Sequence, residues 1–158
     1  MRVQFLLNIL LTIVWVFLSG TFNSMNFVFG FVLSFLVLWL INTNKRSKKY
    51  FVIIPRIMGF FFYFLYALIK ANIQVAADVV TPKFYMEPGI IEYPLDAKSD
   101  LEITLLANVI TLTPGTLSLD VSGDRKVLYV HGMYVHDKEE FIRGIKDGFE
   151  KRILKIIR

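Results

Sequence analysis

The run from Val3 to Ile41, 39 residues long, contains no Asp, Glu, Lys, Arg or His. A hydrocarbon core about 30 Å thick needs roughly 20 helical residues for each crossing, so this run is long enough for two crossings and a turn. Small and polar residues gather at its midpoint, Gly20-Thr21-Phe22-Asn23-Ser24. The sequence therefore predicts a transmembrane helical hairpin with helices over residues 3–19 and 25–42.

The positive charge of the chain lies in its apolar half. The formal net charge is +5, which by itself could indicate nucleic-acid binding. Residues 1–81 carry seven Lys or Arg against one acid, a net of +6, whereas residues 82–158 carry eleven against twelve, a net of −1. The cluster Lys45-Arg46-Ser47-Lys48-Lys49 follows the second predicted helix. Because basic flanks stay in the cytoplasm, we expect both ends of the hairpin on the cytoplasmic side. Because the basic excess belongs to the apolar half of the chain, we expect no nucleic-acid partner.

A secretory signal peptide is the alternative interpretation of the first apolar run. The small-x-small cleavage pattern is poor around Leu18-Ser19-Gly20, and a second apolar run follows at once, so a mature hairpin is favoured. The chain has no cysteine, which excludes disulfides, thiolate metal sites and cysteine nucleophiles.

A third apolar segment, residues 56–80, allows two interpretations. Pro55 suits the first turn of a helix, but only about 13 apolar residues precede Lys70, which is short for a crossing. Helical periodicity nevertheless continues through Asp78. The helix either crosses the bilayer at a tilt or lies along the cytoplasmic interface. A third crossing would place residues 82–158 outside, and we expect them in the cytoplasm.

Residues 82–158 have the pattern of a small soluble α+β domain. The predicted elements are a strand at 89–95, a helix at 101–113, a hairpin of strands at 116–121 and 126–135, and a final helix from 138. Ser99 or Asp100 is expected to cap the first helix, and Asp137, with Glu140 three residues later, the last. The predicted fold is a membrane protein of class α+β: the hairpin, a long aromatic helix and a C-terminal β-α-β-β-α domain.

Catalytic chemistry is not indicated by the residues of the C-terminal domain. His131 and His136 stand five apart on a predicted strand, so they point to opposite faces and cannot share a metal ion. Glu139 and Glu140 diverge on a helix, and acids favour a first helical turn in any case. No phosphate-binding glycine loop, HExxH or GxSxG pattern occurs. We therefore predict no enzyme activity and no catalytic, cofactor-binding or metal site.

Ion transport by this chain alone is disfavoured by the same kind of test. Ion carriers need ionisable or coordinating groups at membrane depth, and the hairpin has none. Its Asn, Ser and Thr residues are expected to form interhelical hydrogen bonds. Lys70 and Asp78 are the better candidates, and we expect them to make polar contacts at the membrane interface, with headgroups or with neighbouring protein.

A specific pattern occupies the end of the helix predicted at 101–113. It reads Asn108-Val109-Ile110-Thr111-Leu112-Thr113-Pro114-Gly115-Thr116. This segment resembles the Asn-x-Ile-Thr-Leu-Thr-Pro-Gly-Thr signature of the E-type subunit of the Mrp-type multisubunit sodium/proton antiporters. The paired N-terminal apolar segments, the basic connection, the aromatic third segment and the final helix, which begins with acids and ends with Lys and Arg, are similar to that family along the whole chain.

The resemblance implies an accessory subunit of a bacterial plasma-membrane complex. Its partners would be the other Mrp subunits and the lipid bilayer, with no cofactor. Larger subunits akin to the antiporter subunits of respiratory complex I would carry the ions, exchanging sodium for protons, and the E-type subunit would be required without holding the ion path. Two alternatives remain: a stand-alone small transporter that uses Lys70 and Asp78, or a membrane-anchored ligand-binding domain.

The signature itself has two interpretations. Pro114 and Gly115 suit any helix end followed by a turn. The polar residues around them could instead dock a neighbouring subunit, beside the apolar stripe of the same helix. As candidate subunit-interface residues we take Asn108, Thr111, Thr113, Pro114, Gly115 and Thr116.

Overall fold

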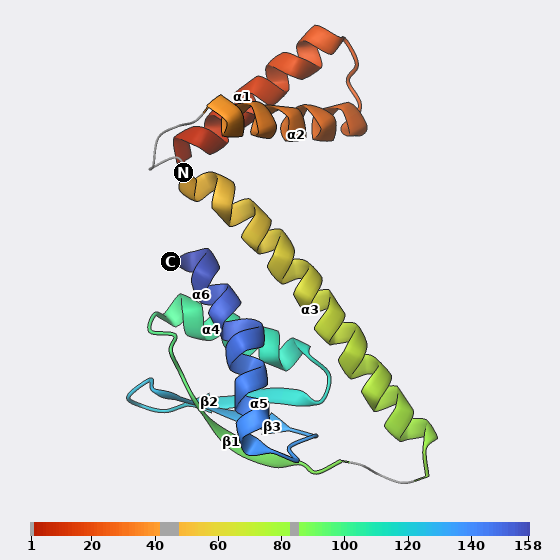
Figure 1. The fold of residues 1–158 in the computed structure, drawn as a ribbon, viewed down its shortest axis with the longest axis vertical. Coiled ribbons are helices and arrows are strands. Elements are labelled where there is room, and N and C mark those ends of the chain that lie inside the picture. The colour runs from red at the N-terminus through yellow and green to blue at the C-terminus, as the bar shows by residue number, and fades with distance from the viewer. Residues whose placement is uncertain (1, 42–47, 83–85) are drawn as a thin grey trace. The chain divides into compact units, whose positions relative to one another are not determined.

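The computed structural model describes residues 2–41, 48–82 and 86–158 (Figure 1). Contacts between residues divide the chain into two compact units, Met1–Pro55 and Arg56–Arg158. Lys45, Arg46 and Ser47 of the basic cluster lie outside the described residues, as does residue 42, where the second helix was expected to end. Each unit has its own packing and is described in turn.

The first unit contains the predicted helical hairpin. Helices α1 (Arg2–Ser19) and α2 (Ser24–Ile41) pack against each other. Gly20 adopts the left-handed conformation (φ +64°) that commonly ends a helix. The Asn26 side chain fastens the turn, because its Nδ2 donates to Ser19 Oγ at 2.6 Å while its Oδ1 accepts from Trp15 Nε1 at 3.0 Å.

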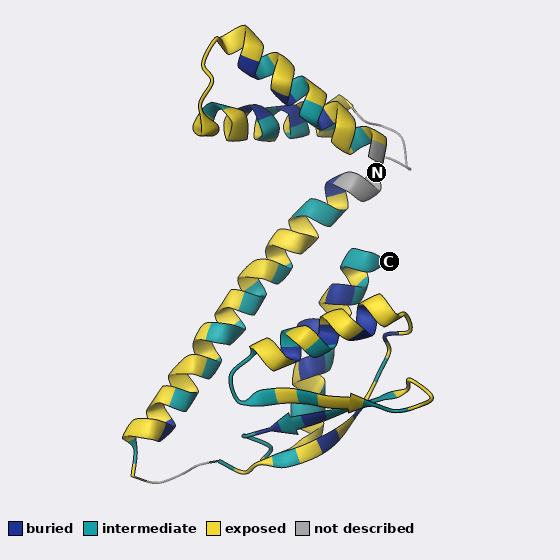
Figure 2. Cartoon of the chain, turned by 180° about the vertical axis from the view of Figure 1, so that it is seen from behind, coloured by how far each residue is buried: buried dark blue, intermediate teal, exposed yellow. Residues whose placement is uncertain are grey.

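The side of each hairpin helix that faces the other is buried or half-buried, and the outer side is exposed and largely apolar (Figure 2). Asn8 and Thr12 are fully buried and Ser34 is 6% exposed. Thr12 Oγ1 donates to the Asn8 carbonyl at 2.7 Å. Gly30 admits the Trp15 ring, since a Cβ there would lie 2.7 Å from Trp15 Cδ1. The Thr12 bond lies within α1, whereas the bonds of Asn26 with Ser19 and Trp15 join the two helices. Asn8, Thr12 and Ser34 are buried where the helices pack.

Helix α3 (Lys48–Val80) is longer than predicted. It begins eight residues before position 56, so Pro55 lies inside the helix and its expected place in the first turn is wrong. Residues preceding Pro55 gain packing that the local sequence does not reveal: Phe51 is 6% exposed and its ring centroid lies 5.2 Å from that of Phe35. By length and composition, α2 and Phe51–Val80 of α3 could each cross a membrane, and Val3–Ser19 is a shorter apolar helix.

The second unit contains the predicted β-α-β-β-α order after α3. Its elements are β1 (Gly89–Pro94), α4 (Asp100–Leu112), β2 (Thr116–Val121), β3 (Val127–Gly132), α5 (Lys138–Ile145), a single π-helical turn (Lys146–Glu150) and α6 (Lys151–Ile157). The antiparallel sheet has the order β1-β3-β2. Several ends of α4, β1 and β3 differ from prediction by one residue; the larger differences are that β3 ends at Gly132, not at 135, and that the last helix contains the π-turn.

The core lies between one face of the sheet and the helices α4, α5 and α6 (Figure 1). Its buried residues are Tyr93, Leu106, Ile110, Leu128, Val130, Ile145, Phe149 and Ile153. Helix α4 turns Ile103, Leu106 and Ile110 inward. The sequence shows an apolar period at Leu101, Leu105, Val109 and Leu112; its three leucines are consequently exposed, while Val109 packs partly buried against the core.

Both predicted helix caps are present. Ser99 Oγ accepts from Glu102 N, and Glu102 Oε2 accepts in return from Ser99 N, which completes a capping box on α4. Asp137 Oδ1 accepts from the amides of Glu139 (2.7 Å) and Glu140 (3.1 Å) at the start of α5. Each cap occupies backbone donors that a helix leaves unpaired at its N-terminus.

Glu102 also binds the C-terminal arginine. Arg158 Nε donates to Glu102 Oε1 at 3.0 Å, and this bond together with the capping amides lowers the pKa of Glu102 to about 2. A carboxylate with a lowered pKa in the folded state contributes stability above its ordinary pKa of 4.5 and loses it as pH falls toward 2. The thermal stability of the full chain in detergent is therefore measured as the pH is lowered through this range. We expect Glu102→Gln to show a smaller loss of thermal stability on acidification than the original chain, and Glu140→Gln to show the same loss. An identical loss in Glu102→Gln would contradict the assignment.

Candidate functional site

The signature segment forms the corner between α4 and β2. Thr113 caps the C-terminal end of α4, just after Leu112, and its Oγ1 donates to the Val109 carbonyl at 3.0 Å. Thr116 Oγ1 donates to the carbonyls of Ile110 (2.6 Å) and Thr113 (2.9 Å). Gly115 has φ +83°, and its carbonyl accepts from Met133 N at 2.8 Å. These bonds occupy helix-end carbonyls that would otherwise lack donors, so this part of the signature builds the corner.

Thr111 belongs to the same internal set of bonds. Its Oγ1 accepts from Ser118 N at 3.2 Å, while Ser118 Oγ donates to the Ala107 carbonyl at 3.1 Å. Asn108 is different: it is exposed, and none of the hydrogen bonds found within the described ranges involves its side chain. Of the six candidate interface residues, the structure therefore brings five into the corner and leaves Asn108 on the surface.

Asn108 lies in the exposed leucine stripe of α4. Leu101, Leu105, Asn108 and Leu112 are spaced four, three and four residues apart and so share one face of the helix. The three leucines are 60%, 40% and 62% exposed. A row of exposed leucines around one amide is typical of a protein contact surface. Below we call Leu101, Leu105, Asn108 and Leu112 the α4 stripe.

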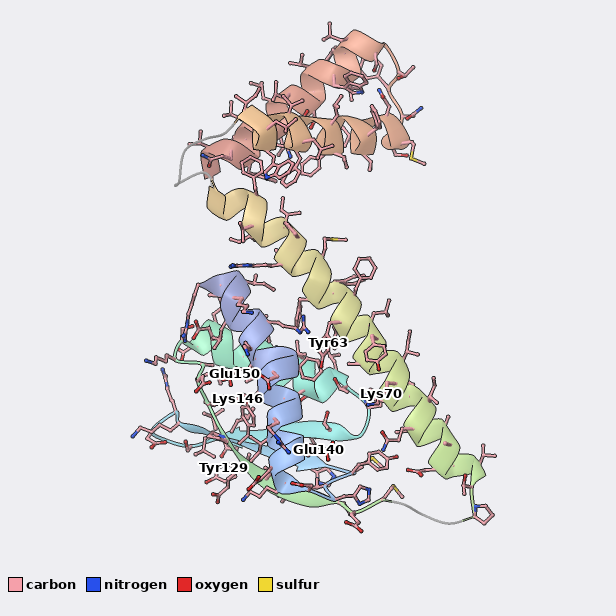
Figure 3. All side chains as sticks on the ribbon, in the orientation of Figure 1. Tyr63, Lys70, Tyr129, Glu140, Lys146 and Glu150 are labelled. Atoms are coloured by element: carbon pink, nitrogen blue, oxygen red, sulfur yellow. The ribbon has the colours of Figure 1, made fainter. Side chains whose placement is uncertain are left out.

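The two ionisable candidates of α3, Asp78 and Lys70, differ in burial and in their partners. Asp78 is 9% exposed, and Tyr134 OH donates a short hydrogen bond to its Oδ2. That bond, together with partial desolvation, raises the pKa of Tyr134 to about 12. Lys70 is exposed on α3 (Figure 3), and no carboxylate of the described chain lies within ion-pair distance of it. Asp78 is therefore bound by Tyr134 of the same chain, and the structure does not bring Lys70 to it.

Helix α3 is fastened to the C-terminal fold at three levels. Just after Pro55, Arg56 Nη1 donates to the Lys155 carbonyl at 2.6 Å. About two turns later, Tyr63 points toward the last helix (Figure 3), where its ring meets Phe149 edge-on at 5.7 Å between centroids. Asp78 binds Tyr134 at the far end. At 1.5 Å per residue these contacts extend over about 33 Å of helix, so residues 56–78 lie along the C-terminal fold.

A buried carboxylate holds the interior of that fold together. Glu150, in the π-turn, is 1% exposed and accepts from Tyr93 OH (2.7 Å), Asp96 N (2.8 Å) and Ala97 N (2.9 Å). Lys146 Nζ lies 3.5 Å from its Oε2 (Figure 3). Burial and the bond to Glu150 raise the pKa of Tyr93 well above its usual range. The carboxylate has enough donors for a structural role without any bound ligand.

The comparisons with known proteins agree over nearly the whole chain. A family model described as "Na+/H+ ion antiporter subunit" matches residues 8–156. The chain belongs to this family of Na+/H+ antiporter subunits. It is 40% identical over 156 residues to the Na(+)/H(+) antiporter E1 subunit of Staphylococcus haemolyticus, covering 99% of this chain and 98% of that protein. The corresponding Na(+)/H(+) antiporter E-type subunit of Alkalihalophilus pseudofirmus is 38% identical, with 99% of each chain covered.

Two solved membrane complexes each contain a chain that is similar to the present one. One is the Mrp complex from Dietzia sp. DQ12-45-1b, where the match is 34% identical with a TM-score of 0.50 and covers 65% of this chain and 96% of that chain. The other is the membrane-bound sulfane sulfur reductase, an archaeal respiratory membrane complex, at 29% identity, a TM-score of 0.56 and 98% coverage of both chains. The family resemblance and the membrane fold class predicted from the sequence are confirmed.

The histidines of this Na+/H+ antiporter-family chain lie apart. His131 is on β3, opposite Ile90 of β1 and Leu117 of β2. His136 lies beyond the end of β3, so its predicted place on the strand is wrong, and its Nδ1 lies 3.0 Å from Glu87 Oε2. Across residues 2–41, 48–82 and 86–158, no three His, Asp or Glu side chains gather closely enough to hold a metal ion.

Sequence reasoning missed the contacts of Glu150 and Tyr134 and the exposure of the leucines of the α4 stripe. Glu150 is followed by Lys151 and Arg152, and it does not belong to the apolar period of its helix, so nothing local marks it as buried. Tyr134 lies 56 residues from Asp78. The apolar period of Leu101, Leu105, Val109 and Leu112 was visible in the sequence, but which of these residues are exposed depends on which face of α4 the sheet covers.

Proposed function

We propose that this chain is an accessory and assembly subunit of a multisubunit Na+/H+ antiporter of the Mrp type in the bacterial plasma membrane. The ion path then lies in other subunits of the complex. Membership of the antiporter-subunit family and the similarity to a chain of the Dietzia Mrp complex support the complex as its setting.

The observation that carries the accessory role is the use of polar groups inside the hairpin. Asn8, Thr12 and Ser34 are buried between α1 and α2, while the outer faces present apolar side chains. No ionisable residue occurs between Val3 and Ile41. A hairpin of this kind suits packing against lipid and partner helices, whereas an ion path requires charged or coordinating groups at membrane depth.

The location of the C-terminal domain, residues 82–158, belongs to the same proposal. Contacts hold α3, from Arg56 to Asp78, against the C-terminal fold. That fold has many charged surface residues, so it does not enter the lipid core, and the stretch of α3 bound to it stays outside the core as well. We place α3 along the cytoplasmic membrane interface over this stretch, with the domain in the cytoplasm. The outer side of α3 carries the exposed apolar residues that such a position requires, among them Phe61, Phe62, Leu65 and Ile69.

Co-purification tests the role. An affinity-labelled full chain, expressed with the other subunits and extracted in mild detergent, is expected to retain the large antiporter subunits. Vesicles that contain this chain alone are expected to show no sodium-dependent proton flux, and vesicles with the whole complex to show it. Flux from the chain alone, lost on Asp78→Asn, would instead support a stand-alone transporter.

The α4 stripe is our proposed contact with a partner subunit. Asn108→Arg places a charge among the exposed leucines without disturbing the α4–β2 corner, and a desolvated unpaired charge at an interface costs several kcal/mol. We expect recovery of the other subunits to fall by about tenfold or more. The control is Lys138→Glu, a charge change at an exposed position of α5. Normal recovery with Asn108→Arg would refute the contact.

The orientation can be measured by labelling, since the chain has no cysteine. Gly123→Cys introduces a thiol in the turn between β2 and β3, where a Cβ meets no atom within 4 Å. A membrane-impermeant maleimide is expected to label it only in inverted vesicles. Phe22→Cys, in the α1–α2 turn, is expected to react only in right-side-out vesicles. Labelling of Gly123→Cys from outside would overturn the proposed topology.

A further inference from the structure

A cavity of about 650 Å³ lies between the first turns of α3 after Pro55 and the end of the chain. It is lined by Arg56, Gly59, Phe60, Asp147, Lys151, Arg152 and Lys155. All of these residues belong to the second compact unit. Four of the seven are basic and one is acidic, so the lining carries a formal excess of three positive charges.

The single acid in the lining is already paired. Lys151 Nζ lies 3.2 Å from Asp147 Oδ1, one helical turn away. Within the part of the chain that the structure describes, no carboxylate lies at ion-pair distance from Arg56, Arg152 or Lys155. Three cations around one cavity repel each other, and the repulsion is relieved when an anion binds between them.

Two of these cations are held in place before any ligand arrives. One Nη of Arg56 donates to the Lys155 carbonyl at 2.6 Å, which orients the guanidinium. The guanidinium of Arg152 lies over the Tyr63 ring, 4.1 Å from its centroid. Guanidinium groups bind phosphate oxygens with paired N–H donors, and preorganisation reduces the entropy lost on binding.

We propose that this cavity binds the phosphate of an anionic phospholipid headgroup. The basic cluster Lys45-Arg46-Ser47-Lys48-Lys49 in the sequence favours the cytoplasmic side for this end of α3, and anionic lipids concentrate in the cytoplasmic leaflet. Exposed apolar residues stand beside Arg56 on the same helix: Ile57 is 45% exposed, Met58 48% and Phe61 54%. Acyl chains have an apolar surface to follow there, which a free phosphate ion would not use. This inference rests on the cytoplasmic placement of α3 in the proposed function.

Gly59 provides a way to block the cavity without changing its charge. A Cβ at this position meets no atom within 4 Å, and the residue is helical, so Gly59→Leu is compatible with the fold. The charge variant is Arg56→Gln/Arg152→Gln/Lys155→Gln. The control, Lys138→Gln/Arg143→Gln, removes two exposed charges of α5 outside the cavity.

Calorimetry measures binding as the full chain, in nonionic detergent, is titrated with one ligand at a time. The ligands are dihexanoylphosphatidylglycerol, dihexanoylphosphatidylcholine and inorganic phosphate. We expect saturable binding of the phosphatidylglycerol, weakened about tenfold or more by the charge variant and by Gly59→Leu, and unchanged in the control. Added salt is expected to weaken it, since the ligand remains partly exposed to solvent.

The other outcomes overturn the proposal. Equal affinity for the phosphatidylcholine, or equal loss in the control, removes the specific site. Equally tight binding of inorganic phosphate assigns the cavity to a free anion. If the charge variant keeps its affinity for the phosphatidylglycerol but fewer of the other subunits co-purify with it, the cavity binds an acidic protein segment and not a lipid.

Discussion

Replacing Glu150 with leucine is expected to lower the free energy of unfolding of the C-terminal fold by about 3–5 kcal/mol. The change removes the acceptor for Tyr93 OH and for the amides of Asp96 and Ala97, all at 2.7–2.9 Å. A buried donor left without an acceptor costs about 1–3 kcal/mol, so the loss is concentrated where β1 leads toward α4. Hydrogen exchange of residues 93–97, in the full chain in detergent, measures the effect.

Matched substitutions separate burial from a general loss of charge. Glu140→Leu changes an exposed glutamate of α5 (Figure 3) and is expected to alter exchange little. Tyr93→Phe alone should be destabilising, and combined with Glu150→Leu it should cost less than the sum of the two changes, because the hydroxyl then no longer lacks its acceptor. Tyr129→Phe, on the neighbouring strand, is the control for Tyr93→Phe. Equal protection in Glu150→Leu and Glu140→Leu would show that the carboxylate is not structural.

Gly148→Leu is expected to displace α3 from the C-terminal fold. A Cβ at Gly148 would collide with the Tyr63 hydroxyl and lie 3.2 Å from Tyr63 Cζ. The ring cannot easily move aside, since Phe149 meets it edge-on and Arg152 covers it. Overpacking of this kind costs about 1–3 kcal/mol. Hydrogen exchange around Tyr63 and the rate of proteolysis in α3 should both rise.

Gly144→Leu is the control, because Gly144 lies one turn earlier in the same run of helix and a Cβ there meets nothing within 4 Å. Leucine has the higher helix propensity, so this variant is expected to be more stable than the original chain by up to about 1 kcal/mol. The two glycine substitutions should therefore have opposite signs. If both are stabilising, the contact between Gly148 and Tyr63 does not hold α3.

Local features of the fold were predictable from the sequence. The hairpin follows from the uncharged run and its turn, and the caps at Ser99 and Asp137 follow from side chains that accept from nearby amides. The signature resemblance, confirmed by the family match, identified the family. These features depend on residues that are close in sequence, so they can be predicted without knowing the contacts between distant segments.

Other features depend on contacts between distant segments. Helix α3 extends back past Pro55 to Lys48, and its far end is bound by Tyr134, 56 residues after Asp78. Which face of α4 is buried depends on the sheet, so a leucine period alone could not distinguish the core from the α4 stripe. At the signature, Thr113 and Thr116 use their hydroxyls within the corner, and only the folded geometry separates them from exposed Asn108.

The π-turn gives the last helix a place that can absorb a change in length. A π-turn contains one residue more than an α-turn, and here it brings three consecutive residues, Gly148, Phe149 and Glu150, into buried positions. Because the π-turn completes about the same rotation as an α-turn with that extra residue, deleting one residue within Lys146–Glu150 would restore a continuous α-helix and keep Ile153 and Arg158 facing as they do now relative to α5. Deleting one residue of α6 would instead rotate everything after it by about 100°. We therefore expect a one-residue deletion to be tolerated better in the π-turn than in α6, unless it removes Phe149 or Glu150.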